Sequence, residues 1–350
     1  MKKIFFLAGL AVLAAAVSSC DENGNFISPK VDVPIESSSD VQAEDLLALK
    51  SADIKTDDKG CYFIEKSASA PLSATVDLKT TETKLPGSLE IDCSSIPEVA
   101  KPSSGKLSQS FLILEMENPA DEKVSFKGSA AADSKVIDLP AVSVDPKSEK
   151  LVAFVSTGSS AVVPPVTVPE EFVAIPSDGD ALDMGPSKIT VKDLGVTSLG
   201  TKAAAPAGGS YSFKVDAMYV APLYYSAGTK LHINRTFQDL KIVLDRINYP
   251  CAEYDIVMDV ENTLPFDIMM SVSSAEGVSG SLKNAIKAGS LNNPVTTSVA
   301  FNVKDSSGKA VSNISTATLG IDLTAAEGAT LQKGQKLGLN VSKVTIIKAL

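Results

Sequence analysis

The sequence has little of what metal-dependent, nucleophilic or phosphate-binding chemistry needs. It contains no Trp, two Arg and a single His, His232, among 350 residues. One His excludes His-based metal clusters and leaves any His-dependent catalytic triad resting on one residue. Glycine-rich phosphate loops, Cys-x-x-Cys pairs and serine nucleophile elbows are also missing. The net charge of −10 opposes binding to a phosphate backbone, so we expect neither an enzyme nor a nucleic-acid-binding protein.

Cysteine is scarce, which limits the number of disulfides. The three cysteines beyond Cys20 are Cys61, Cys93 and Cys251, an odd number, so at most one intramolecular disulfide forms among them. Cys61 and Cys93 lie in the same half of the chain and are the candidates for that bond. The alternative, which we favour because no spacing resembles a metal or redox motif, is three buried thiols that pack as small hydrophobic residues.

The N-terminus has the pattern of a secretion signal. Lys2 and Lys3 precede an apolar run from Ile4 to Val17, and small residues follow that run. A positive start, a short apolar stretch and a small-residue region are typical of a signal peptide, and the run is shorter than a membrane-spanning helix needs. We therefore expect residues 1–19 to be removed as a signal peptide.

The end of this segment resembles a bacterial lipobox. Val17, Ser18 and Ser19 place a branched apolar residue and two small residues before Cys20. The resemblance implies that the thiol of Cys20 is lipidated and that Cys20 becomes the first residue of the mature protein. Two or more acyl chains hold a protein durably, because each buried methylene contributes about 0.8 kcal/mol. We expect a lipoprotein anchored to the outer membrane without spanning it.

The residues behind Cys20 are acidic and polar. Asp21 and Glu22 resemble the surface-export signal of Bacteroidetes lipoproteins, which implies exposure at the cell surface; the alternative is the solvated start of a linker, and both stay open. Residues 20–43 are Ser-rich and contain two prolines, so we expect a lipidated flexible tether. Removal of residues 1–19 takes away two Lys and no acid, which changes the net charge from −10 to −12.

The rest of the chain alternates between apolar and polar residues. Segments 72–78, 211–217 and 299–304 alternate with period two, which gives each one buried and one wet face. This pattern predicts antiparallel sheets. Helix patterns are few and short, at Ala43–Lys50 and Ser281–Ala288.

A run of small residues, Leu199–Ser210, is the expected domain boundary. It divides the chain into domain 1, residues 44–200, and domain 2, residues 208–350, each of ordinary domain size. We predict an all-β fold of two tandem antiparallel β-sandwich domains, immunoglobulin-like or transthyretin-like, after the signal and the tether.

The two halves have the pattern of a duplication. Residues 112–118 align with residues 256–262 without a gap, both segments end in Glu-Asn, and a proline and a further strand follow each. An Asn at a strand end can cap the next turn through its side-chain amide, so Asn118 and Asn262 are the candidate capping residues. The upstream segments that also match are residues 89–92 and 242–245.

One acidic loop is a candidate calcium site. Asp178, Asp180 and Asp183 place three carboxylates in a turn-prone loop, and calcium binds through oxygen ligands. The closing Glu of a twelve-residue calcium loop is missing, so a solvated acidic turn is the alternative that we favour. No cofactor other than calcium is considered.

One group of tyrosines is a candidate ligand surface. Tyr219, Tyr224 and Tyr225 form the densest aromatic group of the chain, and stacked aromatic rings hold sugars in many proteins. The alternative is ordinary packing of tyrosines at a sheet edge. His232 lies between apolar neighbours, and we expect it to be structural.

Taken together, the lipobox, the acidic start, the tether and the tandem β domains resemble a Bacteroidetes-type surface lipoprotein with a distantly fimbrillin-like architecture. Fimbrillin-like pilus subunits are lipoprotein precursors with two β-sandwich domains, in which a protease removes the first strand and a neighbour's strand fills the groove. Arg235 and Arg246 both lie in the second half, so the arginine cleavage site typical of the best-known members has no counterpart near the N-terminus.

The leading hypothesis is a non-enzymatic, membrane-anchored cell-surface lipoprotein with a structural, adhesive or partner-binding role. A fimbrillin-like pilus subunit or accessory is one alternative. A glycan-binding accessory protein of a nutrient uptake system is the other. The expected partners are the outer membrane, reached through the lipid, and a protein or a glycan.

Overall fold

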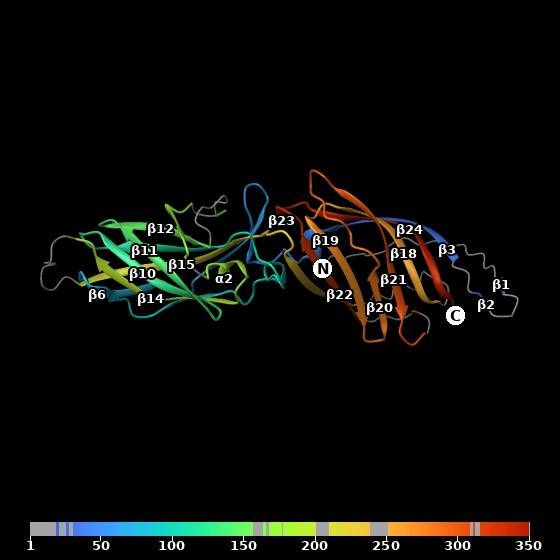
Figure 1. Cartoon of the computed structure of the whole chain (residues 1–350), viewed down its shortest axis with the longest axis horizontal. Coiled ribbons are helices and arrows are strands. Elements are labelled where there is room, and N and C mark those ends of the chain that lie inside the picture. Colours follow the sequence, from blue (N-terminus) through green and yellow to red (C-terminus); the bar gives the residue numbers. More distant parts are fainter. Residues whose placement is uncertain are drawn as a thin grey trace. The chain divides into compact units, whose positions relative to one another are not determined.

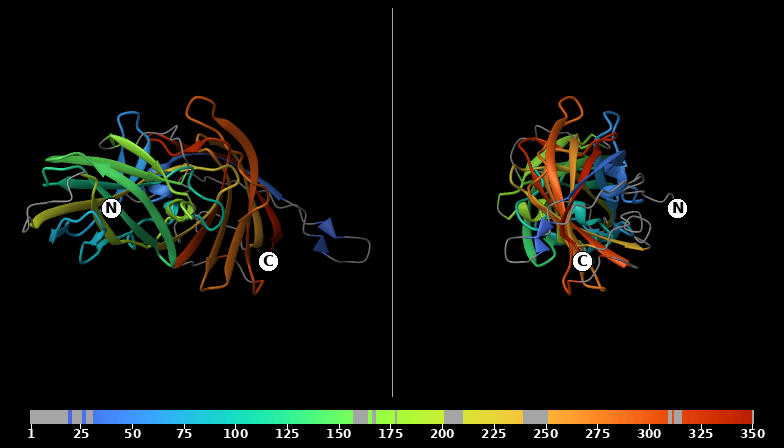
Figure 2. Two further views of the ribbon diagram at one scale, coloured as in Figure 1. Left: turned by 60° about the vertical axis from the view of Figure 1, so that its left-hand side comes forward. Right: turned by 90° about the vertical axis from the view of Figure 1, so that its right-hand side faces the viewer.

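The computed structural model describes residues 19–20, 26–27, 31–156, 164–165, 168–176, 178–200, 210–238, 251–308, 311 and 316–349. The chain divides into two compact units (Figure 1): unit 1 is residues 1–49 and 230–350, and unit 2 is residues 50–229. Figure 2 gives two further views, in which green strands belong to unit 2 and orange and red strands to unit 1. Each unit is described by itself.

Unit 2 consists of strands and two short helical turns. Its elements are β4 (Ile54–Thr56), β5 (Tyr62–Ser67), β6 (Leu72–Asp77), β7 (Thr83–Lys84), β8 (Leu89–Asp92), the 3-10 turn η1 (Glu98–Ala100), β9 (Phe111–Asn118), β10 (Val124–Ala132), β11 (Lys135–Val144), β12 (Ser148–Val155), β13 (Glu171–Ala174), α2 (Asp180–Asp183), β14 (Lys188–Ser198), β15 (Ser210–Pro222) and β16 (Tyr224–Tyr225).

Unit 1 is built from both ends of the chain. Its elements are β1 (Ser19–Cys20), β2 (Phe26–Ile27), β3 (Val31–Gln42), α1 (Ala43–Leu46), β17 (Lys230–Gln238), β18 (Cys251–Asn262), β19 (Phe266–Ser274), β20 (Val278–Leu282), β21 (Val295–Asp305), β22 (Thr316–Ala325), β23 (Ala329–Thr330) and β24 (Lys336–Ala349).

Two sheets pack face to face in unit 2. One sheet has the order β13-β12-β9-β15-β5-β4, with β6 also paired to β15, and the other has the order β11-β10-β14-β7, with β8 also paired to β14. Phe213 of β15 meets Phe126 of β10 edge to face, with ring centroids 5.8 Å apart, so apolar side chains join the two sheets. The alternation along β6 buries Leu72 and Ala74 and exposes Ser73 and Thr75, as the sequence predicts.

The main sheet of unit 1 has eight strands, in the order β17-β22-β19-β20-β21-β18-β24-β3, and β1 and β2 form a separate two-stranded sheet. Strand β3, blue in Figure 1, lies beside β24, red, although the two come from opposite ends of the chain. Lys336 of β24 pairs with Asp40 at 2.6 Å, and Lys343 pairs with Asp32 at 2.5 Å. The two ion pairs accompany the antiparallel backbone pairing between the two strands.

The two units share one strand connectivity. In unit 2, β9 pairs with β12 and β15, β10 with β11 and β14, and β14 with β8. In unit 1, β18 pairs with β21 and β24, β19 with β20 and β22, and β22 with β17. Strands β5 and β6 then take the place beside β15 that β3 takes beside β24. This correspondence supports the predicted duplication.

In each unit a buried Asn at the end of a strand closes the following turn with its side chain, and we call this feature the Asn corner. The Asn118 side chain is 1% exposed, its Oδ1 accepts from the amide of Ala120 at 3.0 Å, and its Nδ2 donates to the carbonyl of Glu122 at 2.9 Å. Asn262 is fully buried and makes the same two bonds, from the amide of Leu264 at 2.7 Å and to the carbonyl of Phe266 at 3.1 Å. The predicted capping role of both Asn side chains is confirmed.

Of the two upstream segments that match in sequence, only the first lies in the described part of the chain. Residues 89–92 form β8, but residues 242–245 and Pro250 lie outside the described residues. The predicted signal peptide lies outside them up to residue 18, as do residues 201–209 of the predicted boundary. Among the described residues no helix has the length and apolar character to cross a membrane.

The tether and the domain boundary differ from the sequence-based expectation. Residues 31–42 are strand β3 and not part of a flexible tether, because they pair with β24 along most of their length, with one irregularity in the register. The division falls at residues 49–50 and 229–230, not at 200–208, and β15 therefore belongs to unit 2. The strands on either side of the small-residue run, β14 and β15, both belong to unit 2.

The two predicted helices are largely wrong. Only Ala43–Leu46 of the first segment is helical, as α1. Residues 281–282 of the second segment belong to β20, and the amide of Ile286 donates to the carbonyl of Ile268 at 2.9 Å. Pairing with neighbouring strands overrides a weak local preference for helix here.

Candidate functional site

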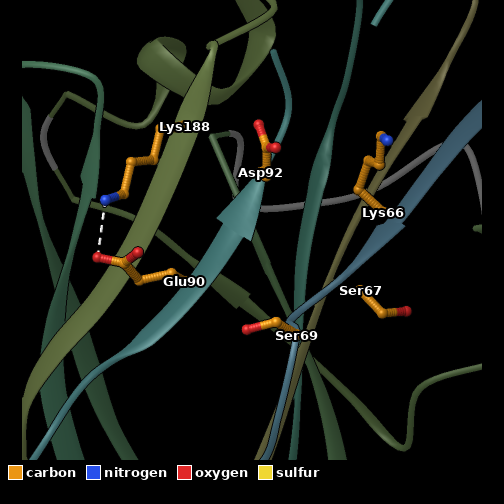
Figure 3. A pocket seen from close by; sticks show the side chains of 6 residues that line it. All are labelled: Lys66, Ser67, Ser69, Glu90, Asp92 and Lys188. Carbon is orange, nitrogen blue, oxygen red and sulfur yellow. Dashed lines mark hydrogen bonds and ion pairs between the residues drawn. The ribbon is translucent and has the colours of Figure 1, made fainter. Parts of the chain in front are cut away.

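A polar cleft in unit 2 is the candidate functional site. It has a volume of about 410 Å³ and lies where β5 and the residues after it approach β8 and β14 (Figure 3). The amide of Ser69 donates to the carbonyl of Glu90 at 3.4 Å, which joins these two parts of the chain. Its six lining residues are Lys66, Ser67, Ser69, Glu90, Asp92 and Lys188.

Lys66 occupies one end of the polar cleft and is held firmly. Its Nζ lies 2.7 Å from Asp53 Oδ1 and donates to Ser95 Oγ at 2.7 Å, while Ser95 Oγ donates to Asp53 Oδ2 at 2.9 Å. The Lys66 side chain is 17% exposed. The hydrogen bond from Lys66 lowers the pKa of Asp53, so this pair is ionised at neutral pH.

The other end of the polar cleft carries a second ion pair. Lys188 Nζ of β14 lies 2.7 Å from Glu90 Oε1 of β8, and this pair is the dashed line in Figure 3. Both side chains are about half exposed, so the pair contributes little to stability. The pair holds the ammonium of Lys188 and the carboxylate of Glu90 at fixed positions in the polar cleft.

Asp92 lies between the two lysines in Figure 3. Its carboxylate accepts from the amide of Ser94 at 2.9 Å. Hydrogen bonds from Ser94, with smaller contributions from the charges of Lys66 and Lys188, lower the pKa of Asp92. Asp92 is therefore a charged hydrogen-bond acceptor at neutral pH and is poorly suited to proton transfer.

The tyrosine surface predicted from the sequence is wrong for two of its three residues. Tyr219 is fully buried, and its hydroxyl donates to the carbonyl of Leu182 at 2.8 Å. Tyr225 is 1% exposed, and its hydroxyl donates to the carbonyl of Val99 at 2.9 Å. Only Tyr224 is partly exposed. Tyr219 lies on the central strand β15 and Tyr225 on the short strand β16, and the hydroxyl of each has a backbone partner inside unit 2.

The acidic loop does not gather three carboxylates into a calcium site. Asp178 and Asp180 are exposed, and Asp180 pairs with Lys106 at 2.8 Å. Asp183 is fully buried, its Oδ2 accepts from Ser156 Oγ at 2.8 Å, and its Oδ1 has no partner. Among the described residues no three or more His, Cys, Asp or Glu side chains are grouped to hold a metal.

Burial changes the chemistry of Asp183. Desolvation raises its pKa to about 6, against the hydrogen bonds from Ser156 and Ser110 and the charge of Lys106, which lower it. A carboxyl with such a pKa is suited to acid–base chemistry, but this one is out of contact with solvent.

The candidate disulfide between Cys61 and Cys93 is not formed. Cys61, Cys93 and Cys251 are all buried, and none of them is in a disulfide. Burial raises the pKa of Cys93 to about 12, so this thiol stays protonated. The favoured alternative, buried thiols that pack as hydrophobic residues, describes all three.

His232 lies on β17 opposite Asp322 of β22. Its Nδ1 is 2.6 Å from Asp322 Oδ1, and the side chain is 49% exposed. The pair lies on an open sheet face in unit 1, whereas the polar cleft lies in unit 2.

Sequence reasoning missed the polar cleft. Its lining residues are ordinary charged and hydroxyl residues from three separate segments of the chain, and no motif joins them. The alternation along residues 89–92, which exposes Glu90 and Asp92, was the one signal that these carboxylates share a face.

The solved structures add a comparison of fold. A protein from Parabacteroides distasonis ATCC 8503, provisionally described as secreted, matches 91% of this chain and 99% of its own, with a TM-score of 0.55 and 16% identity. A structure of the infectious bursal disease virus Gx strain matches 81% of this chain and 41% of its own at 8% identity. Its TM-score of 0.23 is too low to indicate a shared fold. No protein-family model and no curated protein matches the sequence. The first likeness shows an all-β fold shared with a protein of a Bacteroidetes species.

Proposed function

We propose that the chain is a membrane-anchored envelope lipoprotein with a non-enzymatic, partner-binding role. The observation that carries this proposal is strand β3, which begins at Val31, so that ten residues separate it from Cys20. Ten residues span at most about 35 Å when fully extended. A lipid on Cys20 would thus hold unit 1 close to the membrane surface. The likeness to a protein provisionally described as secreted supports an envelope location.

The chemistry of the carboxyl groups supports a role in binding. Asp92, in the polar cleft, has a lowered pKa and stays ionised. Asp183, whose pKa is raised to about 6, is fully buried and out of reach of a substrate. The accessible carboxylate therefore accepts hydrogen bonds, and the carboxyl tuned for proton transfer is inaccessible.

Fractionation of a Cys20→Ala variant tests the anchor. We expect the parent protein in the outer-membrane fraction with a mass increase from acyl chains. The variant should be soluble or should keep its signal peptide, since it lacks the thiol that forms the thioether. Unchanged membrane fractionation of Cys20→Ala would refute the proposal.

The matched control for this test keeps the thiol and removes the charges behind it. Asp21→Asn combined with Glu22→Gln should remain lipidated and in the membrane fraction. Protease shaving of intact cells then reports the leaflet: loss of surface exposure in this variant alone would favour the export-signal interpretation of the two acids over the linker interpretation.

A fimbrillin-like pilus component is the second candidate, and strand β3 favours it. A strand from the N-terminus completes unit 1 beside the last strand of the chain, so release of β3 would open the edge of β24 to a strand of another copy. Ladders of protein in heated but unboiled gels would support polymerisation. A strictly monomeric mature form would exclude it.

The third candidate, a glycan-binding accessory protein, loses the surface on which it was predicted. Tyr219 and Tyr225 are buried and cannot stack on a sugar. Substitution of these tyrosines would damage the core and would not test binding. A glycan-binding role therefore depends on another surface of the molecule.

A further inference from the structure

The polar cleft selects its ligand first by net charge. Lys66 faces Asp53, and Lys188 faces Glu90, so each ammonium already has a carboxylate partner. Asp92 adds a carboxylate for which no ion-pair partner within 4.0 Å occurs among the described residues. The sum over these five groups is one negative charge, which disfavours an acidic ligand such as a phosphate, a uronic acid or a sialic acid.

The hydrogen-bonding groups of the polar cleft select the ligand further. Asp92 offers a charged acceptor, and Ser67 and Ser69 offer hydroxyls that both donate and accept. The two paired lysines keep their remaining N–H groups as donors. Donors and acceptors interspersed over a small area match a ligand whose own groups do both, as sugar hydroxyls do.

Size and polarity exclude other classes of small ligand. A volume of about 410 Å³ is in the range of small-molecule sites. None of its six lining residues is aromatic or aliphatic, so the cleft offers no burial to an apolar compound. Lys188 and Glu90, whose side chains are about half exposed, form part of its wall, so the cleft is open to solvent and suits the end of a larger molecule.

We propose that the polar cleft binds a neutral sugar at the end of a glycan. Asp92 accepts hydrogen bonds from sugar hydroxyls, Lys66 and Lys188 donate to sugar oxygens, and the Ser67 and Ser69 hydroxyls complete the contacts. This inference rests on the proposed partner-binding role of an anchored protein and names the partner's chemistry.

The test uses the full chain, recovered from the outer-membrane fraction in detergent, on a printed array of neutral hexose oligosaccharides, sialylated oligosaccharides and oligouronates. We expect retention on neutral glycans and not on the two acidic classes. Calorimetry with the strongest neutral oligosaccharide then gives the affinity. Recovery from the membrane fraction tests the anchor, and retention on the array tests the cleft, so the two proposals fail separately.

Two variants test whether the sugar binds in the polar cleft. Asp92→Asn keeps the size of the side chain and removes the charged acceptor, so the affinity should fall by about tenfold or more. Asp138→Asn is the matched control, because Asp138 is also exposed, on β11, and does not line the cleft. It should bind as the parent does. A circular dichroism melt that is the same for all three proteins shows that both variants are folded.

Three outcomes overturn the inference: no retention of the folded parent on any glycan, retention on acidic glycans only, or equal affinity of Asp92→Asn and the parent. An equal loss in Asp92→Asn and Asp138→Asn also overturns it, because a general effect of surface charge would then explain both. Retention on neutral glycans with a loss specific to Asp92→Asn supports it.

Discussion

Units 1 and 2 have the same strand connectivity and the same Asn corner, but they are assembled from different parts of the chain. Unit 2 is continuous, and strands β5 and β6 beside β15 come from its own N-terminal part. Unit 1 obtains the corresponding strand, β3, from the start of the chain, with the whole of unit 2 between β3 and β17. The same topology can therefore be completed locally or from a distance.

A second difference lies in the sheets. In unit 1, β20 pairs with both β19 and β21, so the eight strands form one continuous sheet. In unit 2, β11 pairs with β10 and β12 with β9, and the two sheets stay separate in the described strands. The polar cleft lies where β5 of one sheet approaches β8 and β14 of the other.

Deletion of residues 21–42 should have the largest effect, and it should affect unit 1 alone. It removes β3, exposes the edge of β24 and leaves every strand of unit 2 in place. We expect loss of cooperative folding in unit 1, because a long unpaired edge strand loses its ladder and favours aggregation. Hydrogen exchange followed by mass spectrometry should show fast exchange over residues 251–349 and protection over residues 111–155. Full protection of both segments would mean that unit 1 folds without β3.

The Asn corners give the next largest effect. Asn118→Ala and Asn262→Ala each remove several hydrogen bonds and leave buried backbone groups without partners, at a cost of about 2–4 kcal/mol in the unit that carries the change. Local unfolding free energies from hydrogen exchange are the measurement. If one substitution weakened both units equally, the two corners would not be independent.

Asp183 should give unit 2 a pH dependence of its own. Its pKa in the folded chain is raised from 3.8 to about 6, so the folded state binds this proton more tightly than the unfolded state. The free energy of unfolding should therefore fall by about 2–3 kcal/mol as the pH rises from about 4 to about 6, and stay level above that. Asp183→Asn should abolish this fall. Denaturant unfolding at a series of pH values checks it, and an unchanged slope in the variant would contradict the assignment.

In unit 1 the pH dependence should have the opposite sign. For Asp267, desolvation raises the pKa, but hydrogen bonds from Lys287 and from the amide of Ala288 outweigh it and lower the pKa overall. The stabilisation from such a group is present at neutral pH and is lost as the pH falls through the lowered pKa. Comparison of Asp183→Asn with Asp267→Asn in the same pH series sharpens this contrast.

The ion pairs between β3 and β24 should give the smallest effect. Lys336–Asp40 and Lys343–Asp32 involve side chains that are 35–50% exposed. A double-mutant cycle on either pair should give a coupling energy of less than about 1 kcal/mol, which decreases with added salt. A larger, salt-independent coupling would show that these pairs, and not the backbone ladder, hold β3 in place.

Local features were predictable because their causes are local. The alternation in residues 72–78 and 211–217 follows from one face of a strand being buried, and the structure confirms it in β6 and β15. The caps of Asn118 and Asn262 involve residues two and four positions further on, so the spacing in the sequence was sufficient.

Non-local features were not predictable from the same sequence. Residues 31–42 have the composition of a tether, and only the presence of β24 about 300 residues later makes them a strand. The run of small residues at 199–210 has the composition of a linker, yet β14 and β15 on either side of it both belong to unit 2.

The candidate site illustrates the same limit. Tyr219 and Tyr225 belong to a dense aromatic group in the sequence, but Tyr219 on the central strand β15 and Tyr225 on β16 are both buried in the folded chain. The polar cleft joins residues up to 122 positions apart, from Lys66 to Lys188, and no short motif records that proximity.

The sequence by itself determined the all-β character and the Asn corners, because strand periodicity and turn capping depend on neighbours within a few residues. The tertiary structure decided which strand completes unit 1, where the units divide, which tyrosines are buried and where the polar cleft lies. Those features depend on pairs of segments far apart in the chain, whose meeting is set by the packing of the whole unit.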